Sequence, residues 1–299
     1  MYGVLATSRL RVYPLNLTCI ITAQGNTSQQ NIINLYNQVK SRFPVSARKR
    51  LFLFKNFKTM DTKTEKQHKL SFDQFATKYD AWFMENENLL RSEVALVAYA
   101  LNKPGRTLSV GCGSGLFEYF LKNDHGIDIN EGIEPSESMA EIATKRGMKV
   151  SIGTAEEGEF GNGVYDTVLF NGTPSYISDI NAAFEKAYYA LKKGGKIVVI
   201  DVPKDGSFAM LYNMAKTLGT WEHDLLKDIK PDTVYPIEFV KDANWRTTPE
   251  KVEALKKVGF QNFKYAQTLT THPLYSNDES EQPKDGYKQG NYVAITGIK

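Results

Sequence analysis

Residues 108–117 read LSVGCGSGLF, a short apolar stretch followed by a glycine-rich turn and the start of an amphipathic segment. Glycines at positions 111, 113 and 115 allow the backbone to take positive φ angles, and they let a ligand approach without a Cβ in the way. In an open α/β sheet such a turn lies at the carboxyl end of the first strand, where ligands bind. The stretch therefore predicts a strand, a ligand-binding turn and a helix, in that order.

Alternating segments extend this pattern through residues 106–201. The residues predict strands at 106–111, 129–134, 148–153, 164–170 and 195–201. They predict helices at 115–123, 136–146 and 178–192, and a short or degenerate helix near 156–163. Strands that alternate with helices of about 10–15 residues indicate crossover connections and a parallel sheet with helices on both faces. We therefore predict an α/β fold of the doubly wound, Rossmann-like type.

Further predicted elements flank this alternation. Ser71 is expected to cap a helix that runs to Phe83, and a second helix spans about 88–101. After the alternation, residues 203–246 interrupt the regular pattern with a mixed segment rich in aromatic side chains. The chain then continues with a predicted helix at 248–258, a strand near 261–270, a polar loop at 277–290 and a strand near 291–298.

The spacing of the glycines and the residues after the second strand point to a nucleoside cofactor. A dinucleotide-binding fingerprint requires glycine at position 116, where this chain has Leu116, and the turn has no lysine for a P-loop. Glu134 ends the second predicted strand, where a carboxylate can accept both hydroxyls of a ribose. Met139 is placed to lie against an adenine, and the turn 153–157 after the third strand to contact the adenine edge. Each turn alone is also typical of an ordinary strand-to-helix connection, but three in order favour a ligand site.

The segments that carry these features resemble a known enzyme family. They are Phe72–Asp80 (FDQFATKYD), the glycine turn, Glu134-Pro135-Ser136, Gly153–Glu156, Tyr165–Val168 and Leu191–Gly195. With them, the chain from about Ser71 to Lys299 resembles the class I S-adenosylmethionine-dependent methyltransferases, and is similar to the small-molecule branch that includes the ubiquinone/menaquinone-biosynthesis type. The resemblance implies a seven-stranded, mostly parallel sheet with helices on both faces and an antiparallel last strand.

The resemblance also implies the cofactor S-adenosyl-L-methionine, the product S-adenosyl-L-homocysteine and the residues that hold them. The implied cofactor-binding residues are Tyr79, Gly111, Cys112, Gly113, Gly115, Glu134, Pro135, Met139, Thr154, Ala155, Glu156 and Asn171. One position departs from the family pattern, because an acid usually stands two positions before the first glycine and this chain has Ser109. That acid helps to hold the methionine end of the cofactor, so either another group substitutes for it or binding is weaker.

Methyl transfer requires alignment of the acceptor with an activated methyl group, and it does not require a catalytic base. The candidates for a base are Tyr176, Asp201, His223 and His272, of which Tyr176 and His223 are the predicted catalytic residues. Residues 171–176 lack the Asn/Asp-Pro-Pro-Tyr motif that indicates methylation of amides or exocyclic amines, and no His/Asp cluster has metal-ligand spacing. We therefore expect transfer, without a metal site, to N, O, S or C of a small molecule.

Aromatic residues in two segments are predicted to form the acceptor pocket. The resemblance implies that an insertion such as 203–246 forms a lid over the acceptor, and Tyr79, Trp82 and Phe83 are predicted to line the same pocket. Aromatic residues with few charges suit a small, partly apolar acceptor. Two alternatives remain: an RNA or protein methyltransferase steered by the basic N-terminus, and a non-catalytic protein that binds the cofactor.

Charges are distributed unevenly along the 299 residues. Residues 1–59 hold nine Lys or Arg and no Asp or Glu, whereas the rest of the chain holds 28 basic and 34 acidic residues. The net charge of +3 therefore combines +9 and −6. The acidic part offers no argument for nucleic-acid binding, which calls for clustered positive charge. We predict residues 1–65 as a basic extension or leader and residues 66–299 as the methyltransferase domain.

The acid-free N-terminus leaves several interpretations open. An acid-poor leader is typical of a mitochondrial or plastid transit peptide, and a secretory signal fits less well because Asn16 and Thr18 interrupt the apolar stretch. Residues 48–50 (RKR) could form a basic arm that binds nucleic acid, or the segment could lie outside the enzyme with Met60 as its start. Two cysteines and the lack of any run of about 20 apolar residues predict no disulfide framework and no membrane span. The expected location is cytoplasmic, or organellar if the segment is a transit peptide.

Overall fold

The computed structural model describes residues 9–15, 18–24, 52–54 and 58–299, and the chain divides into two compact units, residues 1–63 and 64–299. In the first unit, β1 (Arg9–Leu15) pairs antiparallel with β2 (Thr18–Gln24), and β3 (Phe52–Phe54) pairs parallel with β2. Residues 9–15, 18–24 and 52–54 of the acid-free segment thus form a three-stranded sheet. The basic run 48–50 lies outside the described residues.

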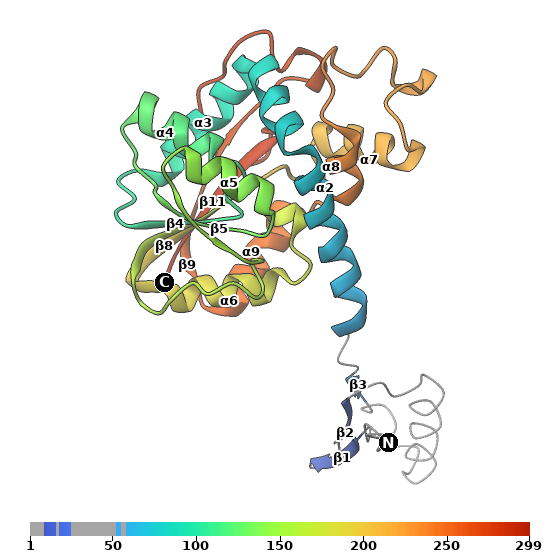
Figure 1. Cartoon of the computed structure of the whole chain (residues 1–299), viewed down its shortest axis with the longest axis vertical. Coiled ribbons are helices and arrows are strands. Elements are labelled where there is room, and N and C mark those ends of the chain that lie inside the picture. The colour runs from blue at the N-terminus through green and yellow to red at the C-terminus, as the bar shows by residue number, and fades with distance from the viewer. Residues whose placement is uncertain (1–8, 16–17, 25–51, 55–57) are drawn as a thin grey trace, which may run out of the picture. The chain divides into compact units, whose positions relative to one another are not determined.

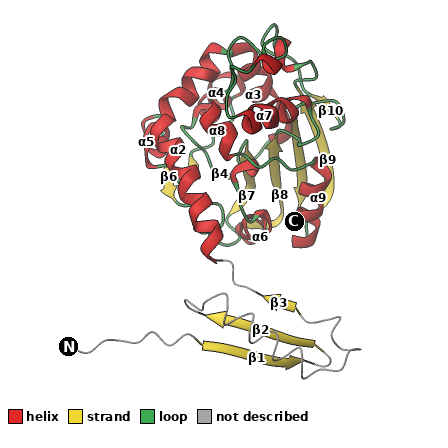
Figure 2. Cartoon of the chain, turned by 90° about the vertical axis from the view of Figure 1, so that its right-hand side faces the viewer, coloured by secondary structure: helices red, strands yellow, loops and turns green. Residues whose placement is uncertain are grey.

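An eight-stranded sheet forms the centre of the second unit, in the order β10-β9-β11-β8-β7-β4-β5-β6. Figure 2 labels β10, β9, β8, β7, β4 and β6 of this sheet. The strands are β4 (Thr107–Val110), β5 (Glu131–Glu134), β6 (Lys149–Ile152), β7 (Tyr165–Asn171), β8 (Leu191–Asp201), β9 (Gln261–Thr268), β10 (Lys284–Asp285) and β11 (Tyr292–Ile298). Strands β4 to β8 run parallel, whereas β11 is antiparallel to β8 and β9. The predicted α/β fold with an antiparallel last strand is confirmed. All seven predicted strands are present, and the two-residue β10 adds an eighth within the expected polar loop.

Helices cover both faces of this sheet (Figure 1). The helices of the described residues are α2 (Lys58–Glu85), α3 (Glu87–Leu101), α4 (Leu116–His125), α5 (Glu137–Lys145), α6 (Ile180–Ala190), α7 (Ser207–Leu218), α8 (Ile237–Asp242) and α9 (Thr248–Val258), with the 3-10 helices η2 (Pro174–Tyr176), η3 (Asp224–Leu226) and η4 (Pro273–Tyr275). Successive residues of a strand point to opposite faces. Leu169 and Val198 therefore belong to the core under α3, α4 and α7, whereas Val168 and Val199 belong to the core under α6 and α9.

Helix α2 begins earlier than predicted. It runs through Ser71 instead of starting there, so the predicted N-cap at Ser71 is wrong. A serine caps a helix where the backbone leaves the helical conformation, and residues 58–70 instead continue the helix with good helix formers such as Glu65 and Lys66. The backbone departs from helical geometry at Phe75 (φ −120°, ψ 20°), and this kink rather than a cap divides the helix.

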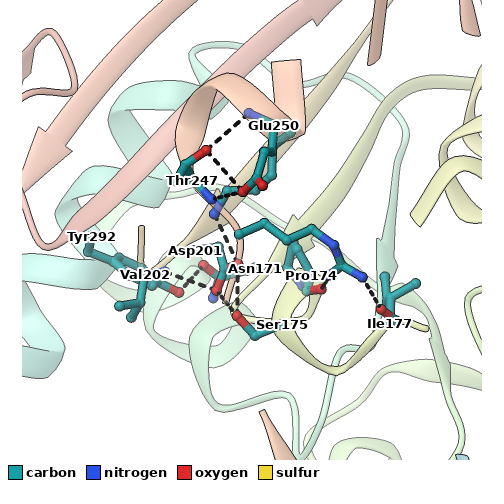
Figure 3. A network of polar contacts seen from close by, with 11 residues as sticks. Asn171, Pro174, Ser175, Ile177, Asp201, Val202, Thr247, Glu250 and Tyr292 are labelled. Carbon is teal, nitrogen blue, oxygen red and sulfur yellow. Dashed lines mark hydrogen bonds and ion pairs between the residues drawn. The ribbon is translucent and has the colours of Figure 1, made fainter. Parts of the chain in front are cut away.

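A buried ion pair fixes the carboxyl end of β8. Lys251 of α9 places its Nζ 3.0 Å from Oδ2 of Asp201, and the two side chains are 1% and 3% exposed. The Asp201 carboxylate also accepts hydrogen bonds from Ser175 Oγ (2.8 and 2.9 Å) and from the N–H of Val202 (2.9 Å), as Figure 3 shows. A buried pair is tolerated when further hydrogen bonds satisfy its charges. These contacts therefore hold α9, η2 and the end of β8 together.

Lys251→Met is expected to lower the free energy of unfolding by about 3–5 kcal/mol, because Asp201 would remain as a buried charge without its partner. Urea denaturation followed by circular dichroism measures the change. Lys145→Met is the matched control, since Lys145 forms an exposed i,i+4 pair with Glu141 and such pairs contribute little. Equal losses of stability in the two variants would contradict the role assigned to the buried pair.

Candidate functional site

The glycine turn between β4 and α4 is held against the neighbouring strand. The N–H of Gly111 donates to the carbonyl oxygen of Ile133 (2.7 Å). Gly111, Gly113 and Gly115 have φ angles of 68°, 56° and 70°, a region that favours glycine. A Cβ on Gly111 would meet the Thr173 side chain at 2.4 Å, whereas a Cβ on Gly113 would have no protein atom within 4 Å. The turn is therefore packed against protein at Gly111 and open toward the adjoining pocket at Gly113.

Glu134, at the end of β5, reaches across to this turn. Its Oε2 accepts the N–H of Gly113 (2.9 Å), and its Oε1 accepts the N–H of Ser136 (2.9 Å). Glu134 is 5% exposed, and burial raises its pKa to about 7 although the two amides act in the opposite direction. A carboxylate has about four lone-pair sites. Two of them therefore remain available for hydroxyl groups of a ligand.

One pocket, with an empty volume of about 1250 Å³ that includes its opening to solvent, connects the glycine turn to a group of aromatic side chains. All predicted cofactor-binding residues except Cys112 and Gly115 line it, namely Tyr79, Gly111, Gly113, Glu134, Pro135, Met139, Thr154, Ala155, Glu156 and Asn171. Cys112 instead packs with Ala143 and Met148, and Gly115 forms the N-cap of α4. These two positions shape the turn and do not face the pocket.

Aromatic side chains line the other end of the pocket, which we name the aromatic chamber. Its residues are Phe72, Tyr79, Trp82, Phe83, Tyr176, Tyr212, Tyr235, Trp245 and Tyr292. Ring centroids lie 4.9 Å apart for Trp82 and Tyr235, 5.1 Å for Phe72 and Tyr176, and 5.5 Å for Tyr212 and Trp245. The segment 203–246 thus supplies part of the chamber wall, together with α2, η2 and β11.

The two predicted catalytic residues lie in different places. Tyr176 lines the pocket, and its hydroxyl is hydrogen-bonded to that of Tyr235. Burial raises the pKa of Tyr176 well above 10, so the phenol stays protonated at neutral pH and can donate a hydrogen bond. His223 is exposed and is not among the residues that line the pocket, because it caps η3 with its Nδ1 accepting the N–H of Leu225 (3.2 Å). His272 caps η4 in the same way and is also exposed.

Glu93 of α3 lines the pocket and was not among the predicted site residues. It lies on the apolar face of α3, four residues after Leu89 and four before Val97, and is 8% exposed. Burial raises the pKa of Glu93 to about 8. A sequence signal for it exists, since glutamate is almost never fully buried unless it is paired. An acid inside the apolar stripe of a helix is therefore a candidate functional residue.

Ser109 occupies the position where the resemblance implies an acid, and the structure brings a carboxylate to it from α4. Ser109 Oγ donates to Glu118 Oε1 (2.6 Å), and both residues are buried. Burial raises the pKa of Glu118, while the Ser109 hydroxyl acts in the opposite direction. The Oε2 atom of Glu118 has no hydrogen-bond partner in the part of the chain that the structure describes. Glu118 therefore places an acid beside the end of β4, although position 109 itself holds a serine.

Two acids of α2 attach this helix to the site. Asp73 Oδ1 accepts the hydroxyl of Ser136 (2.7 Å) at the N-cap of α5. Asp80 Oδ2 pairs with Arg146 (2.7 Å), and Asp80 Oδ1 accepts the hydroxyl of Ser114 in the glycine turn. Helix α2 is therefore fixed relative to the turns that follow both β4 and β5.

A family model described as a methyltransferase domain matches residues 83–247 of the chain. A Thermotoga maritima structure described as an S-adenosylmethionine-dependent methyltransferase, and as a possible histamine N-methyltransferase, is 34% identical to it. The match has a TM-score of 0.65 and covers 77% of this chain and 98% of that one. The chain belongs to the class I S-adenosylmethionine-dependent methyltransferases.

Relatives of this enzyme occur in other organisms. An uncharacterised protein of Methanocaldococcus jannaschii is 32% identical over 228 residues, which are 76% of this chain and 98% of the relative. Phosphoethanolamine N-methyltransferase 3 of Arabidopsis thaliana is 30% identical over 106 residues, which are 33% of this chain and 21% of the relative. The similarity to the archaeal protein thus extends over nearly its whole length, whereas that to the plant enzyme is restricted to one part.

The enzyme uses S-adenosylmethionine, and the turn side of the pocket suits this cofactor. Gly113 leaves open the space that a Cβ would fill, Glu134 retains lone pairs for ribose hydroxyls, and Met139 lines the same pocket. Among the described residues, no group of three or more His, Cys, Asp or Glu side chains could hold a metal ion. None of the helices in the described part of the chain is long and apolar enough to cross a membrane.

The buried state of Glu93 predicts a pH-dependent stability. Its pKa of about 8 lies above the ordinary value of 4.5, so the unfolded chain loses the Glu93 proton at lower pH than the folded chain does. Stability contributed by the protonated carboxyl is therefore complete below pH 4.5 and is lost as the pH rises to about 8. Relative to Glu93→Gln, which cannot ionise, the wild type should lose on the order of 3–5 kcal/mol across this window.

Urea denaturation of the ligand-free protein at pH 5, 6, 7 and 8 measures this difference. Glu87→Gln is the control, because Glu87 is on the same helix but exposed and paired with Arg91. A difference between wild type and Glu93→Gln that does not change with pH would show that the Glu93 pKa is not raised.

Proposed function

We propose that this enzyme transfers the methyl group of S-adenosylmethionine to a small-molecule acceptor held in the aromatic chamber. The observation that carries the proposal is that one pocket connects the glycine turn and Glu134 to the chamber. Mostly apolar pockets with a few polar groups are typical sites for small molecules. A cofactor at the turn and an acceptor in the chamber would then lie next to each other.

The bound cofactor supplies a methyl group that is already activated on a sulfonium sulfur. The residues of this chain bind the cofactor and the acceptor, orient them and exclude water. Glu134 would accept the ribose hydroxyls, and Met139 and Ala155 would contact the adenine. The chamber walls would hold the acceptor in line with the methyl group, and such alignment alone can supply several kcal/mol of the barrier reduction. Tyr176, as a neutral phenol, would donate a hydrogen bond to a polar group of the acceptor.

The lining of the pocket supports a small acceptor over RNA. RNA recognition relies on Lys and Arg contacts to phosphates, and the described residues that line the pocket include neither Lys nor Arg. The names of two similar proteins also support a small molecule, and nitrogen as its acceptor atom. These are the possible histamine N-methyltransferase of Thermotoga maritima and phosphoethanolamine N-methyltransferase 3 of Arabidopsis thaliana.

Glu134→Ala is expected to weaken the binding of S-adenosylhomocysteine by about 1.5–3 kcal/mol, or roughly 10- to 150-fold, because hydrogen bonds to a charged group are lost. Isothermal titration calorimetry of the whole chain measures this change. Glu131→Ala is the matched control, since Glu131 begins the same strand and pairs with Arg106, and it should bind normally. Unchanged affinity in Glu134→Ala, or binding of NAD in place of the cofactor, would contradict the assignment.

The class of acceptor is tested by incubating the enzyme with S-adenosylmethionine labelled in its methyl group. A small-molecule library, total RNA and cell protein are offered in separate reactions, and labelled products are separated and counted. Label is expected in small molecules, with a lower rate for Glu134→Ala at limiting cofactor. Label that enters RNA or protein and no small molecule would overturn the proposed acceptor class.

A further inference from the structure

Glu93 differs from the other acids that line the pocket. Asp201 is paired with Lys251 (3.0 Å), Glu134 accepts two backbone amides, and Glu156 accepts the N–H of Ser178 (2.9 Å). No described group donates a hydrogen bond to Glu93, although it is 8% exposed and burial dominates its environment. Burying a carboxyl group without a hydrogen bond is costly. A ligand that donates a hydrogen bond to this group or carries a positive charge would offset the cost.

Tyrosine side chains line the same pocket as this carboxyl group. Tyr79, Tyr212, Tyr235 and Tyr292 each interact electrostatically with Glu93, and all four belong to the aromatic chamber. Tyr212 and Tyr235 are stacked, with centroids 5.9 Å apart and an interplanar angle of 26°. Aromatic faces attract cations through the ring quadrupole. A chamber with aromatic walls and one unpaired carboxyl group is therefore suited to a positively charged group.

The remaining charges of the pocket agree with this conclusion. The described lining residues include four acids, Glu93, Glu134, Glu156 and Asp201, and no Lys, Arg or His. A phosphate or carboxylate group on the acceptor would need a Lys, Arg or His side chain in the pocket, because these side chains recognise such anions. An anionic acceptor is therefore disfavoured, whereas a bound cation would favour the ionised form of Glu93 and pair with it.

We propose that the aromatic chamber binds the acceptor as a small amine, with Glu93 as the counter-ion of its ammonium group. This inference rests on the proposed function and narrows it to amines that carry neither phosphate nor carboxylate. In this proposal Glu93 recognises the positive charge of the amine, and the aromatic rings exclude water from the ammonium group.

The atoms and charges of the methyl-transfer step balance when Glu93 accepts the proton of the ammonium group. The bound ammonium group gives one proton to the Glu93 carboxylate, and the nitrogen lone pair forms the bond to the methyl carbon. The carbon–sulfur bond breaks, and its electron pair stays on sulfur. The products are a methylammonium ion, the neutral thioether S-adenosylhomocysteine and protonated Glu93, so the total charge is unchanged.

The recognition of charge is tested on the whole chain saturated with S-adenosylhomocysteine. Choline and its neutral isostere 3,3-dimethylbutan-1-ol are titrated in separate calorimetric experiments. Choline should bind about tenfold or more tightly than the neutral alcohol, because the two differ in charge and hardly in shape. In Glu93→Gln this preference should fall to what the aromatic rings alone provide, while the affinity for S-adenosylhomocysteine stays as in the wild type. Glu87→Gln, on an exposed position of the same helix, should keep the preference.

A second measurement uses methyl transfer itself. Labelled transfer to 2-phenylethylamine is compared with transfer to 2-phenylethanol and to phosphoethanolamine, and the amine should be the preferred acceptor. Equal binding of choline and its isostere by the wild type would overturn the inference, as would efficient transfer to the alcohol or to the phosphorylated amine. Those results leave the methyltransferase function intact, whereas failure of S-adenosylhomocysteine to bind would remove both.

Discussion

The parallel pairing of β5, β4, β7 and β8 is the constraint on which the rest of the structure depends. Parallel strands end at one edge of a sheet, so the pairing brings Gly111, Glu134, Asn171 and Asp201 together although they are spread over 90 positions. A register shift of one residue would turn the side chains of the shifted strand to the opposite face. The apolar alternation along β7 and β8, which feeds two separate cores, opposes such a shift.

Local features of the site were predictable from the sequence. The glycine turn depends on backbone geometry within a few residues, Glu134 stands at the end of a predicted strand, and the strand-helix alternation is a periodic signal. Contacts between distant residues were not predictable. Lys251 meets Asp201 across fifty residues, and the two-residue β10 exists through its pairing with β9. Ser71 shows the opposite error, since a local capping preference was overridden by the helix on either side of it.

Three buried acids near the site are stabilised in different ways. Asp201 is paired with a lysine, Glu134 accepts hydrogen bonds from backbone amides, and Glu118 accepts a hydrogen bond from a serine hydroxyl. Histidines behave otherwise, because His223 and His272 use a ring nitrogen to cap 3-10 helices at the surface. Residue type alone therefore does not show which side chains line the pocket, whereas burial and hydrogen-bond partners distinguish acids that are paired within the protein from those that are not.

Glu134 connects the turns after β4 and β5 through two backbone amides without any help from a ligand. The entropy of ordering these turns is therefore lost on folding and not on binding, which favours affinity. The ribose that Glu134 would hold is identical in the methyl donor and in the spent product. Contacts at this end would then stabilise both molecules equally, and uniform binding of this kind does not accelerate the chemical step. If Glu134 holds the ribose in this way, the demethylated product is expected to compete with the methyl donor for the same site.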